Sequence, residues 1–153
     1  MENCLDKTDR QILRLLQNNG RIHNTDLADK VRVSPATCHR RVQRLFDEGY
    51  ISSVQARVDA SRVGLGMVVL VGVVLERTPQ SFPTFEAAMV AQPAVLDCYL
   101  VAGDFDYFLK VRVTDMEGFD RFHTDVLSVL PHVRQTRTFF VLRAVADARE
   151  YAF

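Results

Sequence analysis

The chain has 153 residues, of which 48% are hydrophobic and 25% are charged, as in folded globular proteins and unlike disordered ones. Its 19 basic and 19 acidic residues cancel, no run of about 18 apolar residues is present, and the N-terminus is polar, so we expect neither a membrane span nor a secretory signal. Cys4, Cys38 and Cys98 lack the spacing of a disulfide framework or a zinc site. A reducing cytoplasm is the expected location.

The first predicted element is a helix that follows Leu5 and ends near Asn18-Asn19-Gly20. Asp6 is the expected N-cap, and the Asp9 carboxylate, three residues later, complements the helix dipole. The inward stripe of this helix is apolar and consists of Leu5, Ile12, Leu13, Leu15 and Leu16. Together with the two helices that follow, it predicts a small three-helix unit.

Residues 24–51 read as two short helices joined by a tight turn. Asn24 is the expected cap of the first, and Ser34-Pro35 is typical of the start of the second. The inward face of the second helix is predicted from Cys38, Val42, Leu45 and Phe46. Its other residues combine positive charge with groups able to reach phosphates and base edges, as a recognition helix does. The predicted DNA-binding residues are Ser34, Thr37, His39, Arg40, Arg41, Gln43 and Arg44.

The alternative is an ordinary surface helix with a solvated basic face, because helix-turn-helix geometry also occurs in domains that bind no DNA. The distribution of charge favours DNA. Residues 30–62 carry seven basic and three acidic residues, a net charge of +4, whereas residues 1–29 and 63–153 carry −1 and −3. Positive potential is thus concentrated on the segment predicted to read DNA, where it favours contact with phosphates.

A change of character marks the boundary between two domains. The run from Tyr50 to Val58 has strand composition, as a wing or a connecting strand would, and residues 59–66 hold two glycines and little periodicity. We therefore predict a helix-turn-helix domain over residues 1–56, a linker over residues 57–66 and a second domain over residues 67–153.

The second half predicts the order β-α-β-β-α-β. Its elements are a strand at Met67–Leu75, a helix at Ser81–Ala91, strands at Val95–Val101 and Tyr107–Val113, a helix at Met116–Leu130, and a strand at Val133–Val145. The inward face of the first helix is predicted from Phe82, Phe85, Met89 and Val90, and that of the second from Phe119, Phe122, Val126, Leu127 and Leu130. This order predicts a ferredoxin-like domain in an α+β chain, with both helices on one face of the sheet. Because the bare face is also apolar, we expect a homodimer.

The chain resembles the Lrp/AsnC, or feast/famine, family of transcriptional regulators. The residues that carry the resemblance are Leu5-Asp6-x-x-Asp9-x-x-Ile12-Leu13, Gly20-Arg21, Leu27-Ala28, Val33-Ser34, Cys38-x-x-Arg41-Val42-x-x-Leu45-x-x-x-Gly49-Tyr50-Ile51, Val101-Ala102-Gly103-Asp104-Phe105-Asp106-Tyr107 and Thr136-Arg137-Thr138. The resemblance implies an N-terminal winged helix-turn-helix domain that binds double-stranded DNA, a C-terminal ferredoxin-like domain that senses an amino acid, and dimers that often assemble into octamers. His39 departs from the apolar residue of many relatives.

The resemblance places the effector near residues 101–107, where subunits meet. Gly103 can adopt a positive φ and expose backbone donors to a carboxylate, while Asp104 or Asp106 can accept from an α-ammonium. Leu100, Val101 and Met116 are the apolar neighbours expected to favour a hydrophobic amino acid. The complete set of predicted effector-binding residues is Leu100, Val101, Ala102, Gly103, Asp104, Asp106, Met116, Thr136 and Thr138. The alternative is an ordinary β-turn beside ordinary strand threonines.

Catalysis has little support in the sequence. The four histidines are scattered without metal-ligand spacing, and the cysteine run of an iron–sulfur site is absent, so we predict no cofactor and no enzymatic activity. The predicted function is a sequence-specific DNA-binding transcription regulator whose activity is modulated by a small effector, which we expect to be an amino acid. The alternative is an oligomeric small-molecule-binding module whose helix-turn-helix makes protein contacts.

Overall fold

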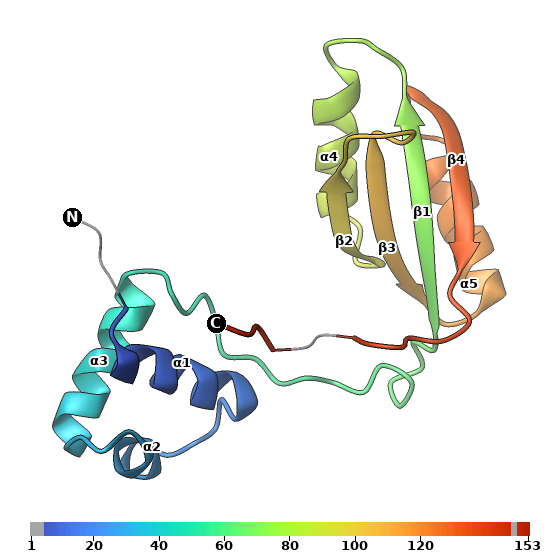
Figure 1. The fold of residues 1–153 in the computed structure, drawn as a ribbon. Helices are drawn as coiled ribbons and strands as arrows, with labels where there is room; N and C mark the ends of the chain where they lie inside the picture. The colour runs from blue at the N-terminus through green and yellow to red at the C-terminus, as the bar shows by residue number, and fades with distance from the viewer. Residues whose placement is uncertain (1–4, 148–149) are drawn as a thin grey trace. The chain divides into compact units, whose positions relative to one another are not determined.

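The computed structural model describes residues 5–147 and 150–153 (Figure 1). The chain forms two compact units. The helical unit consists of the N-terminal part up to Arg57 together with the segment that starts at Ala146, and the sheet unit consists of Val58–Val145. None of the helices in the described ranges is long and apolar enough to cross a membrane.

The first helix, α1 (Lys7–Asn18), begins with the predicted cap. The Asp9 amide donates to Asp6 Oδ1 at 2.8 Å, and the Asp6 amide donates to Asp9 Oδ2 at 3.3 Å. This reciprocal pair satisfies two amides that the first helical turn leaves without an internal partner. The sequence prediction of Asp6 as N-cap is confirmed.

Two helices follow, α2 (Asn24–Val31) and α3 (Pro35–Asp47). The sequence pattern predicted Asn24 as the cap of α2, and this prediction is wrong, because His23 holds that position. Asn24 Nδ2 instead donates to the Pro35 carbonyl at 2.9 Å. The amide side chain therefore ties the start of α2 to the start of α3. Ser34 caps α3 as predicted, accepting from the Thr37 amide at 3.2 Å.

The three helices enclose one small apolar core. It contains Ile12, Leu13, Leu27, Ala28, Val31, Cys38 and Leu45. Phe46, predicted to face inward, is 37% exposed, because Leu45 occupies the last inward position before α3 ends at Asp47. Val42 is half-buried at the margin of the core.

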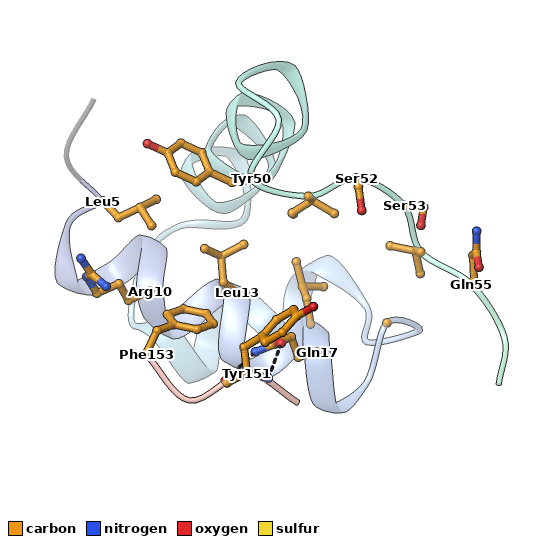
Figure 2. Close-up of a pocket in the computed structure, with 14 residues that line it drawn as sticks. Leu5, Arg10, Leu13, Gln17, Tyr50, Ser52, Ser53, Gln55, Tyr151 and Phe153 are labelled. Atoms are coloured by element: carbon orange, nitrogen blue, oxygen red, sulfur yellow. Dashed lines mark hydrogen bonds between the residues drawn. The ribbon is translucent and has the colours of Figure 1, made fainter. Parts of the chain in front are cut away.

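The segment after α3 is extended but is not a strand, so the predicted strand over Tyr50–Val58 is wrong for this chain. A strand needs the main-chain groups of a neighbour, and the described residues of the helical unit contain no other strand. The segment passes beside α1 instead (Figure 2), where a Cβ atom on Gly20 would lie 2.7 Å from Val54 Cγ1. Gly20 thus makes room for Val54.

The sheet unit has the predicted β-α-β-β-α-β order. Its elements are β1 (Met67–Leu75), α4 (Ser81–Val90), β2 (Val95–Leu100), β3 (Tyr107–Val113), α5 (Met116–Phe122) with a π-helical turn η1 (His123–Leu127), and β4 (Val133–Phe140). The sheet order is β2-β3-β1-β4 with antiparallel neighbours, which confirms the α+β, ferredoxin-like prediction. Strand β4 ends at Phe140 and not at Val145, because its pairing with β1 reaches Val69↔Phe140 and β1 itself begins at Met67.

Helices α4 and α5 cover the same face of the sheet (Figure 1). Val69, Val71 and Val73 of β1 are fully buried on that face. They belong to one core with Phe85 and Met89 of α4 and with Phe119, Phe122 and Leu127 that follow β3. Val90, also predicted to be inward, is 88% exposed, because it is the final residue of α4 and follows the buried Met89 directly.

Candidate functional site

The predicted DNA-binding residues all lie on α3 or at its N-cap. Ser34 is used as the cap, and its hydroxyl also donates to Thr37 Oγ1 at 2.9 Å. His39 and Arg40 are exposed, and within the described parts of the chain neither side chain makes a hydrogen bond or an ion pair. Gln43 is exposed and donates to Asp47 Oδ1 at 3.0 Å. The outward face of α3 therefore presents His39 and Arg40 to solvent.

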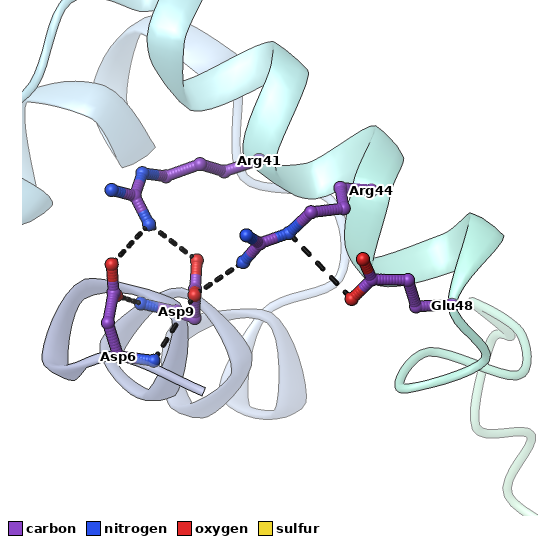
Figure 3. Close-up of polar contacts among 5 residues, drawn as sticks. All are labelled: Asp6, Asp9, Arg41, Arg44 and Glu48. Atoms are coloured by element: carbon purple, nitrogen blue, oxygen red, sulfur yellow. Dashed lines mark hydrogen bonds and ion pairs between the residues drawn. The ribbon is translucent and has the colours of Figure 1, made fainter. Parts of the chain in front are cut away.

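Arg41 and Arg44 turn toward α1 (Figure 3). Arg41 Nη1 lies 2.7 Å from Asp6 Oδ2 and 2.8 Å from Asp9 Oδ1, and Arg44 Nη2 lies 2.5 Å from Asp9 Oδ2. The Asp9 side chain is only 1% exposed, whereas those of Arg41 and Arg44 are 27% and 42% exposed. These two arginines hold α3 against the N-terminal end of α1.

The contacts of the Asp6 carboxylate, which caps α1, favour its charged form. The backbone amide of Asp9, and next the Arg41 guanidinium, lower the pKa of the Asp6 carboxyl below its ordinary value. The sequence marked Asp9 only as a favourable charge at the start of a helix. Its second contact, with two arginines more than thirty residues away, depends on how α1 and α3 pack.

The predicted effector loop lies between β2 and β3. The Val101 amide donates to the Asp106 carbonyl at 2.9 Å and closes the loop, in which Gly103 has a φ of 151°. Ala102, Gly103 and Asp104 are exposed. Gly103 is in the region of φ that favours glycine, as the sequence predicted.

Asp106 is buried and already has partners for both carboxylate oxygens. Its Oδ2 accepts from the Leu75 amide at 2.8 Å, and its Oδ1 lies 2.9 Å from Arg77 Nη2. Its own amide donates to the Val73 carbonyl at 2.9 Å. Asp106 therefore fastens the loop to the end of β1, whereas Asp104 is exposed and has no ion pair in the described part of the chain.

Phe105, which the sequence did not single out, lies over the bare face of the sheet. A Cβ atom on Gly72 of β1 would be 2.7 Å from its ring, so only glycine permits this approach. The Phe105 ring meets Phe108 edge-on at 5.3 Å between centroids, and the Arg137 guanidinium lies 5.7 Å from its centre. A glycine inside a valine-rich strand was the signal for this contact.

The remaining predicted effector residues divide between two places. Thr136 pairs with Val73, which also pairs with Tyr107, so Thr136 lies at the end of the sheet that carries the loop. Met116 follows the other end of β3, a seven-residue strand that spans about 20 Å. Met116 and Thr138 line a hollow of about 610 Å³ beside α5 and β4, together with Glu117, Phe119, Asp120, His123 and Phe140.

Comparisons with known proteins assign each of the two units to a known domain family. The winged helix-turn-helix DNA-binding family matches residues 5–52, and the Lrp/AsnC ligand binding domain matches residues 68–151. The chain belongs to the Lrp/AsnC family. The leucine-responsive regulatory proteins of Salmonella typhimurium and Escherichia coli K12 are each 39% identical to it over 145 residues, which cover 94% of this chain and 88% of theirs.

Solved structures agree with this assignment. A transcriptional regulator from Neisseria meningitidis in complex with L-Met has a TM-score of 0.91 and 34% identity, with 94% of each chain covered. A feast or famine regulatory protein from M. tuberculosis complexed with L-methionine has a TM-score of 0.87 and 27% identity, with 97% of this chain and 99% of that chain covered. This Lrp/AsnC protein is accordingly a DNA-binding transcription regulator modulated by a small ligand, and its partners are double-stranded DNA and that ligand.

Proposed function

We propose that this regulator reads DNA with the N-terminal half of α3, and that Arg40 and His39 make the contacts while Arg41 and Arg44 set the position of the helix. The observation that carries the proposal is the division of the three arginines. Arg41 and Arg44 pair with carboxylates of α1, whereas Arg40 is exposed next to the helix start. Ser34, Thr37 and Gln43 complete the proposed DNA surface, where short polar side chains and the amides of a helix N-terminus suit phosphate contacts.

The proposed effector is an apolar amino acid. Two structural relatives are complexes with L-methionine, which supports this class. In the proposed site the exposed backbone around Gly103 binds the carboxylate of the amino acid, Asp104 accepts from its ammonium, and Asp106 supports the loop from below. Because Met116 lies about 20 Å from the loop in one chain, we propose that Leu100, Val101, Ala102 and Thr136 act with the loop, and that Met116 and Thr138 come from another subunit.

A homodimer that further assembles to an octamer is part of the proposal. Tyr99 and Phe139 are 59% and 41% exposed on the sheet face that the helices leave bare, and Val68 and Leu70 are only half-buried there. An aromatic and aliphatic face of this kind is stabilised when a second copy removes it from water. We further propose that the protein binds and does not catalyse, as its relatives are regulators, and that it works in the cytoplasm, where it meets DNA.

Two assays test the function. A thermal-shift screen of the twenty amino acids should single out an apolar one, because a ligand that binds only the folded state stabilises it by RT ln(1 + [L]/Kd). A gel shift on the DNA upstream of the protein's own gene should show retention that the same amino acid changes. A thermal shift without any DNA retention would favour a helix-turn-helix that makes protein contacts.

A further inference from the structure

The helical unit has a groove on the outer side of α1 (Figure 2). The groove has a volume of about 560 Å³ and lies between α1 and the extended segment 50–55. Leu13 and Leu16 give it an apolar floor, and Tyr50 stands on the opposite side. The groove is apart from the outward face of α3 that carries Arg40, so the DNA-binding proposal leaves it without a role.

Segment 151–153 of the same chain lies along α1 and forms one wall of this groove (Figure 2). Gln17 Nε2 donates to the Tyr151 carbonyl at 3.2 Å, and the Tyr151 amide donates to Gln17 Oε1 at 3.0 Å. One amide side chain thus pairs with both main-chain groups of Tyr151, as a neighbouring strand would. The contact recognises the course of the backbone and is independent of the tyrosine side chain, which is 82% exposed.

Arg14 binds the end of the same segment. Its Nη2 donates to the Phe153 carbonyl, and its guanidinium lies 5.7 Å from the centre of the Phe153 ring. Phe153 is 38% exposed, so most of its ring is covered. Earlier in the chain than this segment, Arg57 Nη2 donates to the Asp147 carbonyl at 3.1 Å. Three separate side chains of the helical unit therefore hold residues that follow the sheet unit in the chain.

We propose that the side of α1 that borders this groove is a docking site for segment 151–153 of the same chain, with Gln17 binding the backbone of Tyr151 and Arg14 binding Phe153. The chain leaves the helical unit after Arg57 and re-enters it at Ala146, so docking adds a second, non-covalent tether between the DNA-binding unit and the ligand-binding unit to the covalent linker. A unit tethered at two points has less orientational freedom than one tethered by a single linker. The docked segment thereby narrows the orientations in which α3 can meet DNA.

The absence of tryptophan from the chain gives a direct test. Phe153→Trp introduces a single tryptophan into this chain. Because the Phe153 ring is 38% exposed, the docked tryptophan should be quenched by acrylamide roughly two- to threefold less efficiently than free tryptophan amide. Adding Arg14→Ala and Gln17→Leu should raise quenching to that of the free amide. Gln55→Leu is the matched control, because Gln55 lines the same groove and has no hydrogen bond in the described part of the chain.

Three outcomes decide the proposal. Protection that is lost with Arg14→Ala/Gln17→Leu and kept with Gln55→Leu supports it. Quenching at the rate of the free amide in the Phe153→Trp protein overturns it. Mixing this protein with an excess of Arg14→Ala/Gln17→Leu subunits, which lack tryptophan, should leave the quenching unchanged; a rise would show that the segment occupies the groove of another copy, and would overturn docking within one chain.

Discussion

Asp9 in the helical unit and Asp106 in the sheet unit are the two buried carboxylates of the described residues, and each lies beside a predicted functional element. Asp9 pairs with the guanidinium groups of Arg41 and Arg44, which belong to α3. Asp106 holds the Leu75 amide and the exposed Arg77. One carboxylate therefore balances the charge of two arginines of α3, whereas the other binds the backbone at the end of β1. Both carboxylates hold neighbouring elements in place.

The largest effect is expected from Asp9→Ala. It removes the shared partner of two arginines at a position that is 1% exposed, and we expect the free energy of unfolding to fall by about 3 kcal/mol. Urea denaturation at a fixed protein concentration measures the change. Asp26→Ala, an exposed carboxylate in the first turn of α2, is the control and should change stability by less than about 0.5 kcal/mol. Equal stability of the two variants would contradict the role of Asp9.

Asp106→Ala should have the next largest effect, a loss of about 2 kcal/mol, because the buried Leu75 amide is left without an acceptor. Asp106→Asn keeps an acceptor and should lose less stability than Asp106→Ala.

The exposed Asp104 should give the opposite result if it binds the effector. Asp104→Ala should retain the stability of the parent and lose the thermal shift given by the amino acid. A full thermal shift in Asp104→Ala would move the ammonium contact away from this carboxylate.

Arg40→Ala should fold like the parent. If Arg40 reads a base, the variant should bind the operator about 1–3 kcal/mol more weakly. If Arg40 contacts a phosphate, the slope of the logarithm of the binding constant against the logarithm of the salt concentration should fall in magnitude by about one. Fluorescence anisotropy over a range of salt concentrations separates these cases. Arg134→Ala removes an exposed arginine of β4 and is the control for net charge. Arg44→Ala should reduce stability as well as affinity, because it breaks the ion pair with Asp9. Unchanged affinity in Arg40→Ala would argue against this face of α3.

The smallest effect is expected on the stability at low pH. The folded state lowers the pKa of Asp6 from its ordinary value of 3.8, so the contribution of this carboxylate to stability is complete above that pH and is lost as the pH falls through the lower, folded pKa. The Asp6 side chain is 50% exposed, which limits the effect to less than about 1 kcal/mol. Denaturation between about pH 5 and pH 2 should show a shallower loss of stability in Asp6→Asn than in the parent. The same acid slope in both proteins would contradict the assignment.

The helices and strands could be predicted because their signals are local. The pair Asp6 and Asp9, the cap at Ser34 and the buried valines of β1 need only sequence spacing to be recognised, and the structure has them where the spacing predicts. The contacts of Arg41 and Arg44 with α1 could not be predicted in this way, because an arginine at the margin of a helix face serves DNA or a carboxylate according to what packs beside it.

The same distinction holds in the sheet unit. Gly103 and its turn could be predicted from the glycine alone, but the partners of Asp106 are an amide and an arginine about thirty residues earlier in the chain. The separation of Met116 from the loop depends on the direction of β3. Segment 50–58 does not form a strand although its composition is typical of one. Composition indicates the tendency of a segment to pair and does not indicate whether a partner strand is present.

We propose that this regulator binds a particular DNA sequence and changes that binding when an amino acid is bound. The most direct test is anisotropy of labelled DNA from upstream of the protein's own gene, against unrelated DNA of equal length, at about 150 mM salt with and without the amino acid from the thermal-shift screen. We predict an affinity for the upstream DNA that exceeds that for unrelated DNA by at least about a thousandfold, and that changes when the amino acid is added. Equal affinity for both DNA molecules, with no response to the amino acid, would contradict the account.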